Sequence, residues 1–319
     1  WCTFAAVATL LFLLAAFRPV GLDQDSENYV QYYYGNTEQI LEFTFTAISA
    51  LVSFFADSPR GMFVVYALLG ILLHTWAVTR STPFWLLALV VWMGNFYLYQ
   101  EVTQIRVAVA AGLFLVGLSY LAKGEKRTYL LFSLAAACFH YSAFVLPLLT
   151  FFGSRPLTLR GRLVIGAIPL LGYLLFFGGF DPIASLPIPW IQEKLWIYER
   201  LRDSGMAGDA INVFNIVYVM RLLVFYLLLW KYDVIKEQAP NLSLLLKVFA
   251  ISYFCFTALG ALPVMAFRYA ELFGVVEIVM VPYLALTMKP EAFGKSLVIV
   301  FAFGCMMLNV FYNELLKLS

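Results

Sequence analysis

The chain has 319 residues, of which 63% are hydrophobic and only 13% are charged, and its mean hydropathy is +0.85. Soluble globular domains average about 45–50% apolar and about 25% charged residues, so this composition excludes a soluble protein and indicates one that crosses a membrane several times. The net charge of +2 is too small to indicate nucleic-acid binding.

The hydropathy pattern predicts about eleven membrane-spanning or re-entrant helices. The apolar runs occupy residues 2–17, 41–56, 61–78, 83–99, 104–122, 129–151, 161–177, 212–230, 243–262, 269–287 and 296–314. The sequence shows no internal repeat and no low-complexity tract. We therefore predict an all-α polytopic membrane protein in which residues 1–319 form a single integral membrane domain.

Two stretches are too polar to lie within a membrane. Residues 18–40 carry several acidic side chains and a cluster of tyrosines. Residues 178–211 begin with a Gly/Pro-rich piece and continue into a segment, 190–201, with apolar residues at 191, 195 and 198 on one helical face and charges on the other. This second stretch predicts an outward-facing loop that contains an amphipathic helix lying in the membrane interface.

Lys and Arg in short loops predict the orientation in the membrane. The basic loops 153–162, 231–242 and 288–295 are expected on the cytoplasmic side, which places loops 178–211 and 263–268 outside. The turn 123–128 is equally basic, yet only one apolar run separates it from 153–162. Either one basic loop faces outward, or the run 129–151 is broken and returns near His140. We favour the broken, re-entrant segment.

Arg106 and His140 lie on the two apolar runs that flank this basic turn. If both runs are helices they form a hairpin, with Arg106 about 26 Å and His140 about 20 Å from the turn. A cation and an imidazole inside apolar helices are costly to bury without a partner or a purpose. Arg106 alone is equally consistent with an interfacial side chain that extends to water, and His140 alone with a satisfied core histidine. Their similar depth predicts a site for an anionic ligand.

Three further ionisable residues lie in the second half of the chain. Arg221 is near the middle of an apolar run, and Glu277, at a similar depth, is the expected partner if the arginine is purely structural. Arg268, Tyr269 and Glu271 lie where loop 263–268 enters the next run. Arg268 and Glu271 are three residues apart and could pair with each other. Arginine is also the side chain best suited to hold phosphate by forked hydrogen bonds.

The remaining polar residues favour structural interpretations. Glu42, Asp57 and Glu101 are expected at helix ends in contact with solvent or the interface. His74 lies in an apolar run with no charged residue nearby in the sequence, and it is expected to be a satisfied core histidine. The sequence contains no metal-ligand spacing and no nucleotide-binding glycine motif. Several arginines and one histidine without a metal cluster predict a pyrophosphate site that needs neither metal nor cofactor.

Several short motifs carry a family resemblance. They are Gln104-Ile105-Arg106-Val107-Ala108-Val109-Ala110, then the basic turn, then Ala135-Ala136-Ala137-Cys138-Phe139-His140-Tyr141-Ser142-Ala143, together with Gly21-Leu22-Asp23, Asn28-Tyr29, Glu42-Phe43 and Phe267-Arg268-Tyr269. These motifs resemble the core of the EpsG group of Wzy-type polysaccharide polymerases. Val107 stands where that group usually has Gln, and Thr44 stands where a Pro-Gly pair is common.

The resemblance implies a fold related to the C-type glycosyltransferases, which use lipid-linked donors without a metal. It implies a polymerase that transfers a growing glycan from undecaprenyl pyrophosphate to the next lipid-linked repeat unit of a bacterial surface polysaccharide. The fixed arginines would then stabilise the departing pyrophosphate and His140 would serve as base or phosphate donor. The expected catalytic residues are His140, Arg106 and Arg268, and the expected substrate-binding residues are Arg221, Tyr269, Glu271, Asp23 and Tyr29.

The same resemblance implies the surroundings of the protein. Its expected location is the bacterial inner membrane, with the active site facing the periplasm or exterior. Its expected partners are undecaprenyl-pyrophosphate-linked oligosaccharides and membrane lipids, with a chain-length regulator as a further candidate. A ligase of the O-antigen type, which differs in its acceptor, is an alternative. A transporter or flippase of lipid-linked sugars is another, although such proteins often carry internal repeats. A structural subunit would leave the arginines and His140 without a common explanation.

Overall fold

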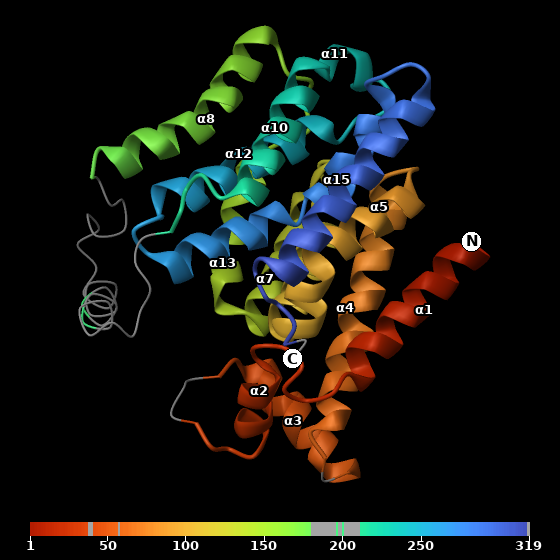
Figure 1. Ribbon diagram of the computed structural model, residues 1–319, viewed down its shortest axis with the longest axis vertical. Coiled ribbons are helices and arrows are strands. Elements are labelled where there is room, and N and C mark those ends of the chain that lie inside the picture. Colours follow the sequence, from red (N-terminus) through yellow and green to blue (C-terminus); the bar gives the residue numbers. More distant parts are fainter. Residues whose placement is uncertain (38–40, 57, 180–195, 197–199, 201–210, 318–319) are drawn as a thin grey trace. The chain divides into compact units, whose positions relative to one another are not determined.

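The computed structural model describes residues 1–37, 41–56, 58–179, 196, 200 and 211–317. Within these ranges the chain is helical and contains no strand (Figure 1). In the described part of the chain, four helical segments are long and apolar enough to cross a membrane, namely Arg60–Ser81, Leu159–Phe177, Pro263–Leu286 and Glu291–Phe311. Shorter apolar helices accompany them. The predicted helical membrane protein is therefore confirmed, while the number eleven and the relation to C-type glycosyltransferases stay predictions.

The described chain forms two compact units. Unit 1 comprises residues 1–154 and 277–319, and unit 2 comprises residues 155–276. The single membrane domain predicted over 1–319 stays a prediction. The amphipathic helix predicted over 190–201, apart from Trp196 and Arg200, lies outside the described residues.

Unit 1 is a helical bundle. Its elements are α1 (Cys2–Phe17), α2 (Ser26–Tyr33), α3 (Phe43–Phe55), α4 (Arg60–Ser81), α5 (Trp85–Trp92), the π-helix η1 (Met93–Thr103), α6 (Ile105–Leu121), α7 (Lys126–Phe139), the 3₁₀ helix η2 (Tyr141–Phe151), α14 (Glu277–Met280), the 3₁₀ helix η3 (Val281–Leu286) and α15 (Glu291–Phe311). The long helix α4 packs against both α1 and α6. Figure 1 shows α1 lying along α4.

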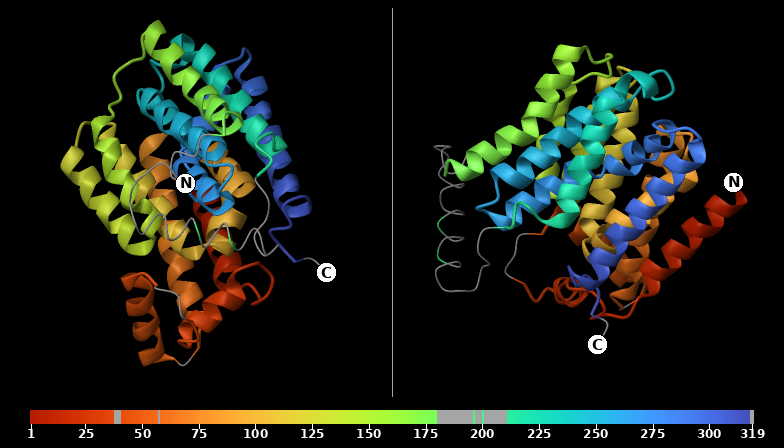
Figure 2. Two further views of the ribbon diagram at one scale, coloured as in Figure 1. Left: turned by 90° about the vertical axis from the view of Figure 1, so that its left-hand side faces the viewer. Right: turned by 45° about the horizontal axis from the view of Figure 1, so that its top comes forward.

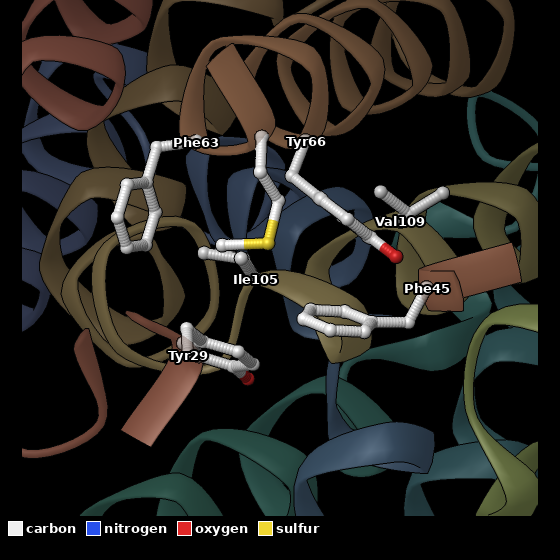
Figure 3. Packing of buried hydrophobic residues seen from close by; sticks show 7 residues of the cluster. Tyr29, Phe45, Phe63, Tyr66, Ile105 and Val109 are labelled. Atoms are coloured by element: carbon white, nitrogen blue, oxygen red, sulfur yellow. The ribbon is translucent and has the colours of Figure 1, made fainter. Parts of the chain in front are cut away.

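An aromatic core lies where α2, α3, α4 and α6 meet. It consists of the buried residues Tyr29, Phe45, Met62, Phe63, Tyr66, Ile105 and Val109. Figure 3 shows the side chains of Tyr29, Phe45 and Tyr66 gathered around Ile105. Burial of so many large rings stabilises the packing by the hydrophobic effect and by ring contacts. This core holds α2 and α3 against α4 and α6.

The acidic stretch after α1 is held by one buried ion pair. Nε of Arg18 donates to Oδ2 of Asp23 at 3.0 Å, and both side chains are almost fully buried. The other carboxylate oxygen accepts from the backbone N–H groups of Asp25 and Ser26 at 3.0 and 2.8 Å, which satisfies donors at the start of α2. Asp23 thereby orders the chain that leads to Tyr29.

The predicted helical hairpin is present, since α6 and α7 pack together across the turn 122–125. The apolar run 129–151 is broken at His140, whose extended backbone (φ −154°, ψ 124°) ends α7 before η2 begins. The Tyr129 hydroxyl on α7 donates to the Leu146 carbonyl on η2 at 2.6 Å. Ser154 Oγ donates to the carbonyl of Ala122, in the basic turn, at 2.5 Å. The chain thus breaks at His140 and returns to the turn, as the prediction of a broken segment requires. Its re-entrant course in the membrane stays a prediction.

The described residues of unit 2 form four longer helices and one short one. They are α8 (Leu159–Phe177), α10 (Ile216–Trp230), α11 (Tyr232–Ile235), α12 (Leu242–Ala258) and α13 (Pro263–Gly274). Helix α12 packs against α8, α10 and α13, and Figure 2 shows α8 and α12 side by side. The side chains of Thr158 and Asn215 cap α8 and α10 by accepting from backbone N–H groups. The hydroxyls of Tyr173 and Tyr253 lie 2.9 Å apart and join α8 to α12.

Candidate functional site

The centre of the candidate site in unit 1 is the carboxylate of Glu42, immediately before α3. Its Oε2 accepts a short hydrogen bond from Nη1 of Arg106. Its Oε1 lies 3.1 Å from Nδ1 of His140. The side chain of Glu42 is only 3% exposed, whereas Arg106 and His140 are 16% and 12% exposed. A buried carboxylate therefore holds two partly accessible groups in fixed positions.

Three local features of the fold bring these groups together. Arg106 is the second residue of α6, and His140 stands at the break between α7 and η2. The hairpin places both at the end away from the basic turn, as the spacing predicted. Glu42 reaches them because α3 packs against α4 and α7. Thr44 on α3 adds a hydrogen bond of 2.6 Å to the carbonyl of Cys138, two residues before His140.

Aromatic rings surround the guanidinium of Arg106. Its Cζ lies 5.6, 5.9 and 5.7 Å from the ring centroids of Tyr29, Tyr32 and Phe45. A guanidinium at this distance from several rings is attracted to their π-faces. Burial raises the pKa of Tyr29 to about 12, so this hydroxyl stays protonated at neutral pH. Tyr29, predicted to bind substrate, thus lies beside Arg106 with its side chain buried.

The charge state of Glu42 follows from its neighbours. Burial alone would raise the pKa of this carboxyl, but the hydrogen bond from His140 and the positive charge of Arg106 outweigh burial and hold the pKa below its ordinary value of 4.5. Glu42 is therefore ionised at neutral pH. A carboxylate beside Nδ1 favours the tautomer in which Nδ1 carries the proton and Nε2 carries the lone pair.

Sequence reasoning placed Glu42 at a solvated helix end, and that prediction was wrong. The signal that could have found it was the balance of charge, since a cation and an imidazole buried at one depth require a nearby carboxylate. Asp23, in contrast, was predicted to bind substrate but is fully buried, with its carboxylate occupied by Arg18 and the start of α2. We therefore leave Asp23 out of the proposed site.

Unit 2 holds a buried ion pair of its own. Nη1 of Arg221 donates to Oε1 of Glu271 at 2.8 Å, and the hydroxyl of Tyr218 donates to the same oxygen at 2.5 Å. Within unit 2 the partner of Arg221 is Glu271, which faces α10 from α13. Glu277, the predicted partner, belongs to unit 1, so its pairing with Arg221 stays a prediction. Glu277 accepts from the side-chain amide of Asn95 at 2.9 Å.

The other predicted residues of unit 2 lie on α13 near this pair. Arg268 is exposed and Tyr269 is partly buried. The possible pairing of Arg268 with Glu271 gives way to the Arg221–Glu271 pair, because Glu271 points toward α10. The structure thus brings Arg221 and Glu271 together and leaves the guanidinium of Arg268 accessible.

A protein-family model for the EpsG family matches residues 1–318. The chain belongs to the EpsG family. EpsG proteins are a Wzy-like polymerase family, so the membership supports a polysaccharide polymerase-like function for this membrane protein. Neither a curated protein nor a solved structure matches the chain significantly.

Proposed function

We propose that this EpsG protein polymerises undecaprenyl-pyrophosphate-linked oligosaccharide repeat units on the outer face of the cytoplasmic membrane. In this reaction the C–O bond between the growing glycan and pyrophosphate breaks, and a new C–O bond forms to a hydroxyl of the next lipid-linked unit. The hydroxyl loses its proton and the lipid pyrophosphate leaves. One observation carries the proposal: Arg106 and His140 meet on the carboxylate of Glu42.

His140 is the proposed base. A hydrogen bond from Nδ1–H to Glu42 leaves the Nε2 lone pair to accept the proton of the attacking sugar hydroxyl. Glu42 then orients the imidazole and stabilises the imidazolium that forms, as the carboxylate does in a catalytic triad. Glu42 acts through His140 and is a positioning residue.

Arg106 is the proposed ligand of the pyrophosphate. A guanidinium has five N–H donors, and Glu42 occupies one nitrogen, so further donors remain for phosphate oxygens. Its Nε is buried and has no hydrogen-bond partner among the described residues. Positive charge fixed beside the bond that breaks would stabilise the developing negative charge of the leaving group.

We further propose that the reaction needs no metal ion. Among the described residues no three His, Cys, Asp or Glu side chains are grouped so that they could hold one. The Arg106 guanidinium supplies a permanent positive charge in its place. Polymerisation should therefore survive an excess of chelator. Loss of activity that returns on addition of a divalent ion would contradict the metal-free mechanism.

The distribution of basic residues in unit 1 supports an outward-facing site. Lys123, Lys126 and Arg127 are exposed in or beside the α6–α7 turn. The guanidinium of Arg80, at the end of α4, lies 4.9 Å from the ring centroid of Tyr120, close to that turn. Arg106 is about 26 Å of helix away from this basic end. The positive-inside rule assigns the basic end to the cytoplasm and hence the site to the opposite side.

Four residues of unit 2 remain proposed contributors to substrate binding. Arg268 is the proposed phosphate ligand on α13, since its side chain is exposed there. The positive charge of Arg221 is neutralised by Glu271. We therefore propose that this pair supports the position of Arg268, and that the pair and Tyr269, nearby on α13, contribute polar contacts to the substrate.

The proposal is tested by complementation of cells that lack the native gene. His140→Ala and Arg268→Lys should each abolish or strongly shorten the glycan ladder on a gel, at a protein level equal to that of the wild type. Arg155→Lys, an exposed change in a cytoplasmic loop, serves as the matched control and should give a normal ladder. A normal ladder from His140→Ala or Arg268→Lys would remove that residue from the mechanism.

A further inference from the structure

A second cluster of polar groups lies in unit 1, apart from the Glu42 site. Nδ1 of His74, on α4, lies 3.0 Å from Oε1 of Glu101, on the π-helix η1. His74 and Glu101 are 0% and 1% exposed. The imidazole stacks on the ring of Trp92, with centroids 4.7 Å apart. His74 is buried, as the predicted core histidine is, but it lies beside a carboxylate from another element. Glu101 was predicted to be solvated or interfacial, and its burial shows that this prediction was wrong.

The fold makes space for these side chains with two glycines. A Cβ added at Gly70 would collide with the carboxyl group of Glu101, and one added at Gly112 would lie 3.3 Å from Nδ1 of His74. Only glycine at position 70 leaves room for the carboxyl group of Glu101. Glu101 itself lies on η1, a π-helix, and π-helical geometry is rare in proteins overall but is often found at functional sites. The backbone is thus shaped around the pair.

The hydrogen bonds inside the cluster are incomplete. Nδ1 of His74 also lies 3.0 Å from the carbonyl oxygen of Gly70. The contact between Nδ1 and the carboxyl group of Glu101 is therefore electrostatic and is not an aligned hydrogen bond. Among the described residues, neither carboxyl oxygen of Glu101 has a hydrogen-bond partner. The same holds for Nε2 of His74 and Nε1 of Trp92. Unpaired polar atoms of this kind cost about 1–3 kcal/mol each unless water satisfies them.

The charge of the cluster is also unbalanced. A buried carboxylate beside a neutral imidazole would leave a net negative charge in the membrane interior, which is strongly unfavourable. Two other ionisable groups interact with Glu101. Arg18 is already paired with Asp23, and Tyr97 donates its hydroxyl hydrogen to the Leu11 carbonyl. One additional proton on the His74–Glu101 pair would make it neutral.

We propose that His74 and Glu101, with Trp92, form a hydrated proton-binding site within the membrane. The site holds internal water molecules and one proton shared between the imidazole and the carboxyl group. Membrane-embedded Glu and His pairs are the groups from which proton-binding sites in membranes are built. This site is independent of the proposed polymerase reaction.

The experiment uses the purified protein in lipid nanodiscs with ¹⁵N-labelled histidine. The chain has two histidines, so a His140→Gln variant assigns the signals. By NMR, we expect magnetisation to transfer from water to the ring of His74 in the wild type. We also expect the ¹⁵N chemical shifts of His74 to stay constant over the pH range in which an exposed imidazole titrates. Failure of water transfer to His74, or titration of its shifts in that range, would overturn the proposal.

Two variants test the shared proton. Glu101→Gln keeps the size of the side chain but cannot share the proton, so both ring ¹⁵N shifts of His74 should change. Gly70→Ala should displace Glu101 and change them as well, which keeps the test available if Glu101→Gln does not fold. Gly304→Ala, on α15 in open space, is the matched control and should leave His74 unchanged. Wild-type His74 shifts in a folded Glu101→Gln or Gly70→Ala protein would contradict a shared proton.

Discussion

Oε1 of Glu42 lies 3.1 Å from Nδ1 of His140, although the two residues are 98 positions apart in the sequence. The same carboxylate bonds Arg106 through its other oxygen. One buried side chain therefore fixes both a potential base and a potential phosphate ligand.

Glu42→Gln should impair polymerisation strongly at normal protein level. Glutamine can still accept one hydrogen bond, but it lacks the charge that orients His140 and aligns Arg106. Hydrogen bonds to charged groups contribute about 1.5–3 kcal/mol, which corresponds to a loss of about 10- to 100-fold. The glycan ladder and initial rate measure the effect. Glu125→Gln, an exposed change in the basic turn, should have the wild-type rate, and an equally active Glu42→Gln would refute the positioning role.

Arg106→Lys should also lower the rate, by about 10-fold or more, because lysine keeps the charge but loses the planar fork with which Arg106 is proposed to hold phosphate while bonded to Glu42. The measurement is the dependence of the initial rate on donor concentration. Arg127→Lys, at the exposed end of the hairpin, is the control. An Arg106→Lys enzyme that matches the wild type would show that only charge matters at this position.

The Glu42 cluster should make unit 1 sensitive to acid. The folded pKa of Glu42 is held below 4.5, so its contribution to the free energy of unfolding is present above the unfolded pKa and is lost as pH falls through the folded pKa. In thermal unfolding at a series of pH values, the wild type should be more stable than Glu42→Gln at neutral pH, and this difference in stability should disappear in acid. A constant difference between the two proteins at all pH values would contradict the pKa shift.

The re-entrant segment predicts the sidedness of two loops. In a variant without the native cysteines, Lys123→Cys and Arg155→Cys should react with a membrane-impermeant thiol reagent from the same side, because Ser154 bonds Ala122. Asn36→Cys, exposed in the acidic stretch near the Glu42 site, should react from the opposite side. Labelling of Lys123→Cys and Arg155→Cys from opposite sides would mean that 129–151 spans the membrane.

The sequence was sufficient to predict the helical membrane protein, the α6–α7 hairpin and the meeting of Arg106 with His140. These features depend on hydropathy and on distances along helices, which a sequence contains. The partners Glu42, Glu101 and Glu271 were missed because each is brought to its cation by packing between helices. The local sequence around a carboxylate at the end of an apolar run is the same whether the side chain faces water or pairs with an arginine.

The central claim is tested most directly by polymerisation in vitro with purified protein and a synthetic undecaprenyl-pyrophosphate-linked repeat unit. The account predicts that wild-type protein releases undecaprenyl pyrophosphate and lengthens the glycan in the presence of chelator. His140→Ala, folded and still able to bind the lipid-linked donor, should release none above background. Glycan extension by His140→Ala at the wild-type rate would contradict the account.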